Sequence, residues 1–188
     1  QKMLEKFHSE SGITIKVSAE FPSGVGLGSS SACCVAAAGS ISGLFGNYTK
    51  EEILKIAIDA ERTIFENTSG ADCTVCAYGG ILEYHKDGQI KRLEFVPKFE
   101  LVVANSGIVH STDKVVSMVR KFKDEKQEFF SSLCMQEKNL IEDALTCLQK
   151  NDLTKLGKLM IQNQEFLEKI KVSNDTLSSM INLVKDVS

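Results

Sequence analysis

The sharpest chemical feature of this sequence is a loop in which every second residue is glycine. Three serines and a helix-like run of small residues follow it, and the segment of interest comprises Gly24, Gly26, Leu27, Gly28, Ser29, Ser30 and Ser31. Glycine allows positive φ and a close approach of the backbone to a ligand. A helix start adds unpaired N–H groups and the positive end of the helix dipole. The pattern therefore predicts a phosphate-binding loop, whose serine hydroxyls are candidates for holding phosphate or Mg²⁺.

Two common phosphate-binding motifs do not fit this loop. No Lys follows the glycines, which excludes a Walker A loop. The spacing G-x-G-x-G, with no long strand running directly into it, is also a poor match to the dinucleotide-binding fingerprint. A flexible turn capped by serines is the alternative interpretation.

Glu61 falls on the apolar stripe of the helix that we predict over residues 49–66. The other members of that stripe are Leu54, Ile58 and Phe65. Because an unpaired carboxylate in a core is costly, Glu61 is expected to meet a metal ion, a cation or water in a cleft. The alternative places Glu61 at the edge of the stripe, where it pairs with a neighbouring Lys or Arg on the surface.

Asp72 stands in the first turn of a short helix predicted over 71–77. An acid at this place complements the helix dipole, and that explanation is sufficient for most such aspartates. The functional interpretation is a general base beside the phosphate site, and it requires Asp72, Glu61 and the glycine loop to converge. Phosphoryl transfer uses such a trio: a phosphate cradle, a carboxylate that holds a metal ion, and a group that orients the nucleophile.

Taken together, these segments resemble the GHMP-superfamily small-molecule kinases, and most closely the mevalonate kinases of archaea. Residues 22–32 are similar to the family segment Pro-x-Gly-x-Gly-Leu-Gly-Ser-Ser-Ala. Residues 69–72 and 78–80 are similar to Ser-Gly-x-Asp with its downstream Tyr-Gly-Gly, and residues 105–112 are similar to the stretch that opens the second domain. The resemblance covers the chain from about residue 13 to residue 122.

The resemblance implies a role for each matching residue. Ser30 and Glu61 would hold Mg²⁺, Asp72 would be the catalytic base, and the loop backbone would bind the phosphates of ATP. Thr112 would lie near the active site from the second domain. His110 stands where eukaryotic members carry an Arg that helps to bind the carboxylate of the acceptor.

Two further positions depart from the family pattern. Thr68 follows Asn67 where the family often has a proline in His-Gly-x-Pro, and Cys73 replaces the usual Asn after Asp72. These differences leave phosphoryl transfer supported but leave the acceptor open.

The predicted elements give an α+β chain, with strands in the first half and helices in the second. Strands are expected over 13–17, 81–84, 89–95 and 101–105, and helices over 29–44, 49–66, 71–77, 112–122, 125–150, 152–170 and 173–186. The resemblance implies a two-domain GHMP-kinase-like fold that is incomplete. Residues 1–96 would form part of a ribosomal-protein-S5-like ATP-binding domain, and 97–188 part of a ferredoxin-like, helical substrate domain.

The composition restricts the partners of the protein. Lys and Arg number 22 against 25 Asp and Glu, so the net charge of −3 favours neither nucleic acid nor an anionic membrane. No second ligand pair gives the six cysteines a zinc-site spacing. We expect reduced cysteines, a cytoplasmic location and no apolar run of transmembrane length. A homodimer is left open.

The function expected from the resemblance is ATP-dependent, Mg²⁺-dependent phosphorylation of mevalonate to 5-phosphomevalonate. The alternatives are a sibling kinase for phosphomevalonate, homoserine, galactose or the 3-hydroxyl of mevalonate, a non-catalytic metabolite-binding member, and a helical interaction module. The family also leads us to expect a Lys-bearing segment before Gln1 and a second glycine-rich loop after Ser188. A protein without these parts would have weak activity or none.

Overall fold

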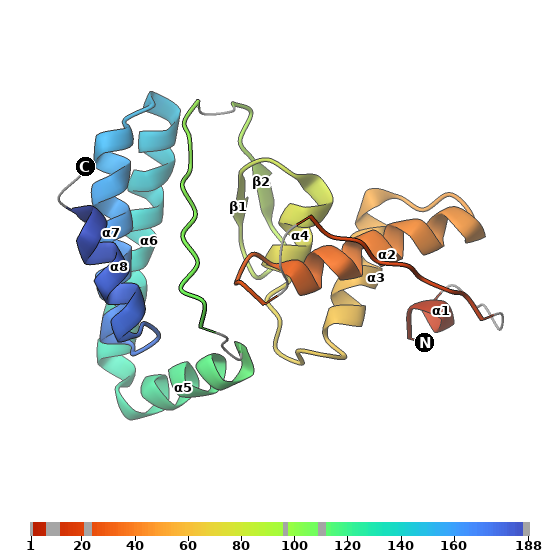
Figure 1. Ribbon diagram of the computed structural model, residues 1–188, viewed down its shortest axis with the longest axis horizontal. Coiled ribbons are helices and arrows are strands. Elements are labelled where there is room, and N and C mark those ends of the chain that lie inside the picture. Colours follow the sequence, from red (N-terminus) through yellow and green to blue (C-terminus); the bar gives the residue numbers. More distant parts are fainter. Residues whose placement is uncertain (1, 7–11, 21–23, 96–97, 109–111, 186–188) are drawn as a thin grey trace. The chain divides into compact units, whose positions relative to one another are not determined.

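The computed structural model describes residues 2–6, 12–20, 24–95, 98–108 and 112–185 (Figure 1). The chain divides into two compact units, Gln1–Val96 and Pro97–Ser188. In the described part of the chain, no helix is both long and apolar enough to cross a membrane.

The first unit is built around the small-residue helix that follows the glycine loop. Its helices are α1 (Lys2–Lys6), α2 (Ser29–Phe45), α3 (Lys50–Glu61) and α4 (Ala71–Tyr78). Helix α2 packs against both α3 and α4, as Figure 1 shows. The buried residues of this core are small or aliphatic, namely Cys34, Ala38, Ile41, Leu54, Ile56, Ala57 and Cys73. Small side chains on α2 let neighbouring helices approach closely, so the start of α2 lies among residues from α3 and α4.

Helix α3 begins at the predicted capping box. The hydroxyl of Thr49 accepts a hydrogen bond from the backbone N–H of Glu52, and the Glu52 carboxylate accepts one from the Thr49 N–H. The helix ends at Glu61, five residues before the predicted end at 66. Turns from Arg62 onward, with the N–H groups of Ile64 and Phe65 both bonded to the Glu61 carbonyl, replace the last predicted turn.

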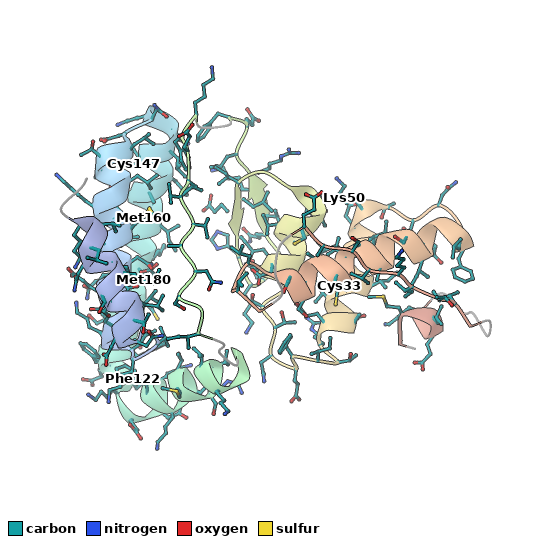
Figure 2. The ribbon with its side chains drawn as sticks, viewed as in Figure 1. Cys33, Lys50, Phe122, Cys147, Met160 and Met180 are labelled. Carbon is teal, nitrogen blue, oxygen red and sulfur yellow. The ribbon has the colours of Figure 1, made fainter. Side chains whose placement is uncertain are left out.

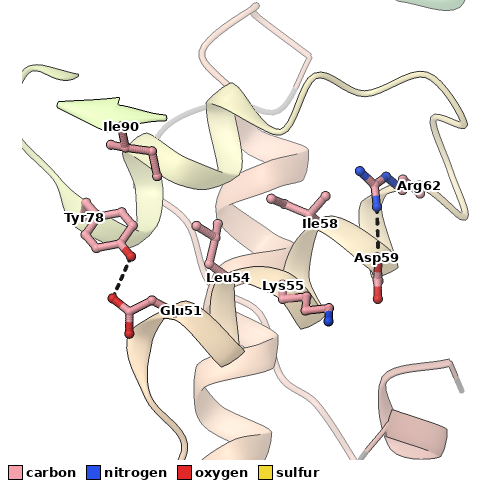
Figure 3. Close-up of a pocket in the computed structure, with 8 residues that line it drawn as sticks. All are labelled: Glu51, Leu54, Lys55, Ile58, Asp59, Arg62, Tyr78 and Ile90. Atoms are coloured by element: carbon pink, nitrogen blue, oxygen red, sulfur yellow. Dashed lines mark hydrogen bonds and ion pairs between the residues drawn. The ribbon is translucent and has the colours of Figure 1, made fainter. Parts of the chain in front are cut away.

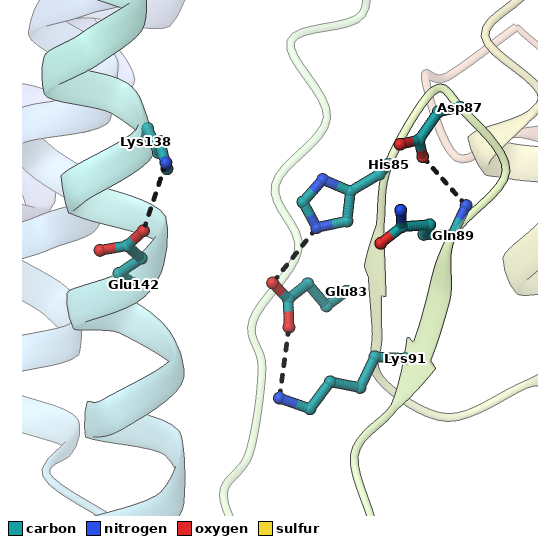
Figure 4. Close-up of polar contacts among 7 residues, drawn as sticks. All are labelled: Glu83, His85, Asp87, Gln89, Lys91, Lys138 and Glu142. Carbon is teal, nitrogen blue, oxygen red and sulfur yellow. Dashed lines mark hydrogen bonds and ion pairs between the residues drawn. The ribbon is translucent and has the colours of Figure 1, made fainter.

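The predicted hairpin is confirmed, with shorter strands. Strands β1 (Leu82–Tyr84) and β2 (Ile90–Arg92) pair antiparallel, with Glu83 opposite Lys91. Figure 4 shows the Glu83 carboxylate between His85, 3.4 Å away, and Lys91, 3.7 Å away. In the turn, Asp87 accepts a hydrogen bond of 3.1 Å from the backbone N–H of Gln89.

The strands predicted over 13–17 and 101–105 are wrong: the structure has neither. A strand is stable when a neighbour completes its main-chain hydrogen bonds, and the hairpin strands β1 and β2 are the only paired strands among the described residues. In the two unpaired segments, 13–17 and 101–105, apolar side chains are open to solvent: Val17 is 62% exposed and Val102 is 94% exposed.

In the described part of the second unit, residues 98–108 have no regular secondary structure and the rest is mainly helical. This unit contains α5 (Thr112–Glu125), α6 (Gln127–Lys150), α7 (Leu153–Lys169) and α8 (Asp175–Lys185), which follow the predicted helices closely. Helices α6 and α7 lie side by side, as the positions of Cys147 and Met160 in Figure 2 illustrate. Their shared core consists of Leu133, Leu140, Cys147, Leu159 and Phe166. Lys138 and Glu142, 4.0 Å apart, form an exposed ion pair along α6 (Figure 4).

Candidate active site

The glycine loop has the backbone that its sequence predicts. Gly24, Gly26 and Gly28 all have positive φ, at 78°, 78° and 66°. Gly28 is also the N-cap of α2, and the Ala32 N–H, which bonds to the Gly28 carbonyl at 2.9 Å, closes the first turn. The N–H groups before Ala32 have no intrahelical acceptor, and the first turn of α2 contains no acid. These features suit an anion at the start of α2.

Asp72 lies against this loop. A β-carbon built on Gly28 would stand 3.6 Å from the Cβ, Cγ and Oδ2 atoms of Asp72. The Asp72 side chain is exposed. The start of α4 therefore brings a solvent-accessible carboxyl group to the start of α2, as the functional interpretation of Asp72 requires.

The turn before α4 fixes the position of Asp72. Gly70 is the N-cap of α4, with φ of 83°, and a β-carbon there would approach Ile58 Cδ1 to 3.0 Å and the Tyr84 hydroxyl to 3.3 Å. Tyr84 donates a 2.5 Å hydrogen bond to the carbonyl of Ser69. Only glycine fits this crowded, left-handed position, so Gly70 and Tyr84 together set where α4 begins.

The Glu61 carboxylate is buried, which excludes the alternative of a surface ion pair with a neighbouring Lys or Arg. The residue is 3% exposed. Its Oε1 accepts a hydrogen bond from the Ser31 hydroxyl, and its Oε2 accepts one from Thr68 Oγ1 at 2.6 Å and one from Cys73 Sγ at 3.5 Å. The neighbouring Arg62 pairs with Asp59 instead, at 3.2 Å.

Burial keeps the surrounding thiols neutral. Desolvation first, and then the negative charge of Glu61, raises the pKa of Cys73 to about 12. The same two causes, in the same order, raise the pKa of Cys34. Near neutral pH, Cys73 is therefore a thiol whose proton is available to the Glu61 carboxylate.

The oxygen atoms around Glu61 are of the kind that Mg²⁺ accepts. Mg²⁺ is commonly held by one or two carboxylates together with substrate phosphates. The Glu61 carboxylate and the Ser31 hydroxyl bonded to it lie at the start of α2, where the features above suit an anion such as a phosphate. The described residues contain no group of three or more His, Cys, Asp and Glu side chains that could hold a metal ion.

The structure brings some predicted site residues together and leaves others apart. The loop, Asp72 and Glu61 converge on the start of α2, but the serine that touches Glu61 is Ser31, whereas Ser30 lies half-buried one position earlier. Thr112 is the first residue of α5 in the second unit, and His110 lies outside the described residues.

Thr68 belongs to this site although the sequence did not assign it a role, and the same holds for Cys73. Both positions are departures from the family pattern, and that was the one signal in the sequence that marked them. Their contact with Glu61 depends on how three separate segments pack, which periodicity does not reveal.

An open pocket beside α3 in the first unit is a separate feature. It has a volume of about 290 Å³ and lies beside α3, where Tyr78 donates a 2.8 Å hydrogen bond to Glu51 (Figure 3). Its walls include Leu54, Ile58 and Ile90, and none of the predicted site residues lines it. The candidate site is therefore defined by its converging polar groups rather than by a cavity.

Comparison with known proteins identifies the class. Residues 1–80 match the model of the GHMP kinases N terminal domain. The chain is 35% identical to a mevalonate kinase of Pyrococcus horikoshii over 95% of its own length and 54% of that protein. It is also 35% identical to a mevalonate kinase of Thermococcus gammatolerans, over 90% of its length and 52% of that protein. The chain thus spans about half the length of these relatives.

A solved structure gives the same result. The crystal structure of L. major mevalonate kinase in complex with R-mevalonate matches with a TM-score of 0.66 and 31% identity, over 82% of this chain and 49% of that one. Residues 1–80 therefore belong to the N-terminal domain family of the GHMP kinases, and the α+β fold of the chain is of the GHMP kinase type, as the sequence predicted.

Proposed function

We propose that the protein transfers the γ-phosphoryl group of ATP to a small-molecule alcohol, and that the alcohol is mevalonate, giving 5-phosphomevalonate. The observation that carries this proposal is the convergence of two carboxylates on the start of α2: Asp72 against Gly28, and Glu61 on Ser31. The mevalonate kinases among its relatives support the choice of acceptor.

The first unit would bind the nucleotide phosphates. The positive-φ loop and the unpaired N–H groups of α2 would present donors to the triphosphate, and the first turn of α2 itself contains no acid. Glu61 and Ser30 would hold Mg²⁺, with Ser31 as the hydroxyl that the structure places on Glu61. The ion, when bound, neutralises charge that develops on the phosphates.

Asp72 would orient the acceptor and take its proton. The alcohol oxygen forms a bond to the γ-phosphorus, the bond from that phosphorus to the β–γ bridging oxygen breaks, and ADP leaves. The hydroxyl proton passes to the Asp72 carboxylate. Because the transition state is loose, most of the acceleration comes from positioning and from charge neutralisation.

The second unit would contribute to acceptor recognition. Thr112 opens α5, and by resemblance this residue and His110 would face the acceptor. A histidine at position 110 would bind an acceptor carboxylate less strongly than an arginine does, and its charge would depend on pH.

A coupled ADP-release assay tests the function with the protein that carries this sequence. The panel is mevalonate, phosphomevalonate, homoserine and galactose, and phosphorus NMR of the product separates the 5-phosphate from the 3-phosphate. We expect the highest kcat/KM with mevalonate and the phosphate on the 5-oxygen. If ADP is released with a different acceptor and not with mevalonate, that acceptor is the substrate and the assignment of mevalonate is wrong. Nucleotide binding with no ADP from any acceptor would overturn the catalytic proposal.

The metal role of Glu61 has its own test. Glu61→Gln should raise the Mg²⁺ concentration needed for half-maximal ADP release, by on the order of tenfold or more, because a neutral amide is a poor Mg²⁺ ligand. Asp59→Asn is the matched control on α3, since Asp59 pairs with Arg62 and Lys6 away from the loop. An unchanged Mg²⁺ requirement in Glu61→Gln would remove Glu61 from the metal site.

A further inference from the structure

The Glu61 carboxylate is surrounded by donors from three different elements. Ser31 donates from α2, Cys73 donates from α4, and Thr68 donates from the loop between α3 and α4. We call these three side chains the donor cage. Thr68 also ties the cage to the catalytic segment, because its Oγ1 accepts a hydrogen bond of 3.3 Å from the N–H of Gly70, the N-cap of α4.

Two of the three cage residues, Thr68 and Cys73, stand where the family pattern that this sequence resembles has Pro and Asn. A proline side chain cannot donate a hydrogen bond. A chain that follows that pattern would therefore lack the contact that Thr68 makes with Glu61.

The cage limits how Glu61 can bind a cation. An ionised carboxylate offers about four acceptor positions on its two oxygens, and three donors occupy three of them. Oε1 has one donor and Oε2 has two. The remaining acceptor position is on Oε1, so a bound cation would contact that single oxygen rather than both oxygens.

This restriction distinguishes between divalent ions. Mg²⁺ takes single carboxylate oxygens in a compact octahedron, whereas Ca²⁺ takes six to eight oxygens and often binds a carboxylate through both of them. Given the proposed function, in which Glu61 is a metal ligand, we propose that Ser31, Thr68 and Cys73 are positioning residues that force one-oxygen coordination and so select Mg²⁺ over Ca²⁺.

The experiment measures binding rather than turnover. The probe is a fluorescent, non-hydrolysable ATP analogue, titrated with Mg²⁺ and separately with Ca²⁺, and the quantity compared is the ratio of the two midpoints. Thr68→Val keeps the shape and removes the donor, and Cys73→Ala removes the second donor to the same oxygen. We expect the ratio of the Ca²⁺ midpoint to the Mg²⁺ midpoint to fall in each single variant. In the variant that carries both changes, it should fall by on the order of tenfold.

Matched variants distinguish an effect on the choice between Mg²⁺ and Ca²⁺ from a general loss of protein stability. Thr68→Ser and Cys73→Ser retain a donor and should keep the ratio of the unchanged protein. Thr74→Val alters a buried neighbour whose hydroxyl bonds to the Gly70 carbonyl at 2.8 Å and not to Glu61, so it should destabilise without moving the ratio.

Two outcomes overturn the inference, and they are distinguishable from failure of the proposed function. The inference is wrong if the ratio stays constant in Thr68→Val and Cys73→Ala, or if Thr74→Val moves it equally. If the unchanged protein binds the analogue equally well without any divalent ion, the Mg²⁺ site is absent and both proposals fail together.

Discussion

The Asp72 side chain packs against Gly28, at the point where the glycine loop becomes helix α2. A β-carbon on Gly28 would stand 3.6 Å from three atoms of Asp72, which is ordinary van der Waals contact. An acid in the first turn of one helix thus lies beside the N-terminus of another. Because that N-terminus favours an anion, the proposed function assigns Asp72 to the acceptor hydroxyl beside the γ-phosphate.

Asp72→Asn should reduce turnover while leaving nucleotide affinity nearly unchanged. A general base is worth about 10²- to 10⁴-fold in rate, and the amide keeps the size of the carboxyl group but cannot take the proton. The measurements are kcat from ADP release and the dissociation constant of the ATP analogue.

Glu51→Gln is the control for the loss of a first-turn acid, since Glu51 is an exposed acid in the first turn of α3. It should show normal turnover. A near-normal kcat in Asp72→Asn would leave Asp72 with only its helix-dipole role.

Gly28→Ala should destabilise the first unit through the backbone rather than through a clash. The left-handed conformation of Gly28, with φ of 66°, costs an L-residue roughly 1–2 kcal/mol. Gly39, in the interior of α2, has no positive φ and open space around a β-carbon, so Gly39→Ala should instead stabilise by about 0.5–1 kcal/mol. Urea denaturation measures the change in unfolding free energy of each variant relative to the unchanged protein. Changes of the same sign in both variants would contradict this explanation.

Substitution of Ser30 and substitution of Ser31, both in the first turn of α2, should have different effects on the Mg²⁺ requirement and on stability. By resemblance Ser30 holds the metal, so Ser30→Ala should raise the Mg²⁺ requirement with little change in stability. Ser31 is 3% exposed and bonds to Glu61, so Ser31→Ala should cost about 1–3 kcal/mol of unfolding free energy, because a buried acceptor loses its donor. A normal Mg²⁺ requirement in Ser30→Ala, with a large increase in Ser31→Ala, would transfer the metal role to Ser31.

Local sequence determined most of what could be predicted. The positive φ at Gly24, Gly26 and Gly28, the Thr49 capping box and the hairpin turn follow from residues close together in the chain, and all are present. The burial of Glu61 was one of two predicted alternatives, since periodicity places the residue on the apolar stripe but does not show what covers it.

The features that sequence did not predict depend on distant partners. Residues 13–17 and 101–105 have the pattern of strands, but a strand needs a neighbour for its hydrogen bonds, and the described residues provide none. The convergence of Thr68 and Cys73 on Glu61 likewise results from the packing of α2, α3 and α4. Helix α3 ends early at Glu61, which lets the following loop turn back and bring Thr68 to that carboxylate.

The buried thiol of Cys73 should make the protein sensitive to alkaline pH. Its pKa is raised in the folded protein to about 12 from the ordinary value of 9.0, so the unfolded chain loses the proton first. The stability that Cys73 contributes is therefore fully present below pH 9 and is lost as the pH rises towards 12, at up to about 1.4 kcal/mol per pH unit. Cys73→Ser keeps a donor for Glu61 but does not titrate, so its urea midpoint should fall less steeply between pH 9 and 11, in the presence of a reducing agent. Cys134→Ser, at an exposed position on α6, should follow the slope of the unchanged protein, and equal slopes in all three proteins would show that Cys73 does not govern the alkaline transition.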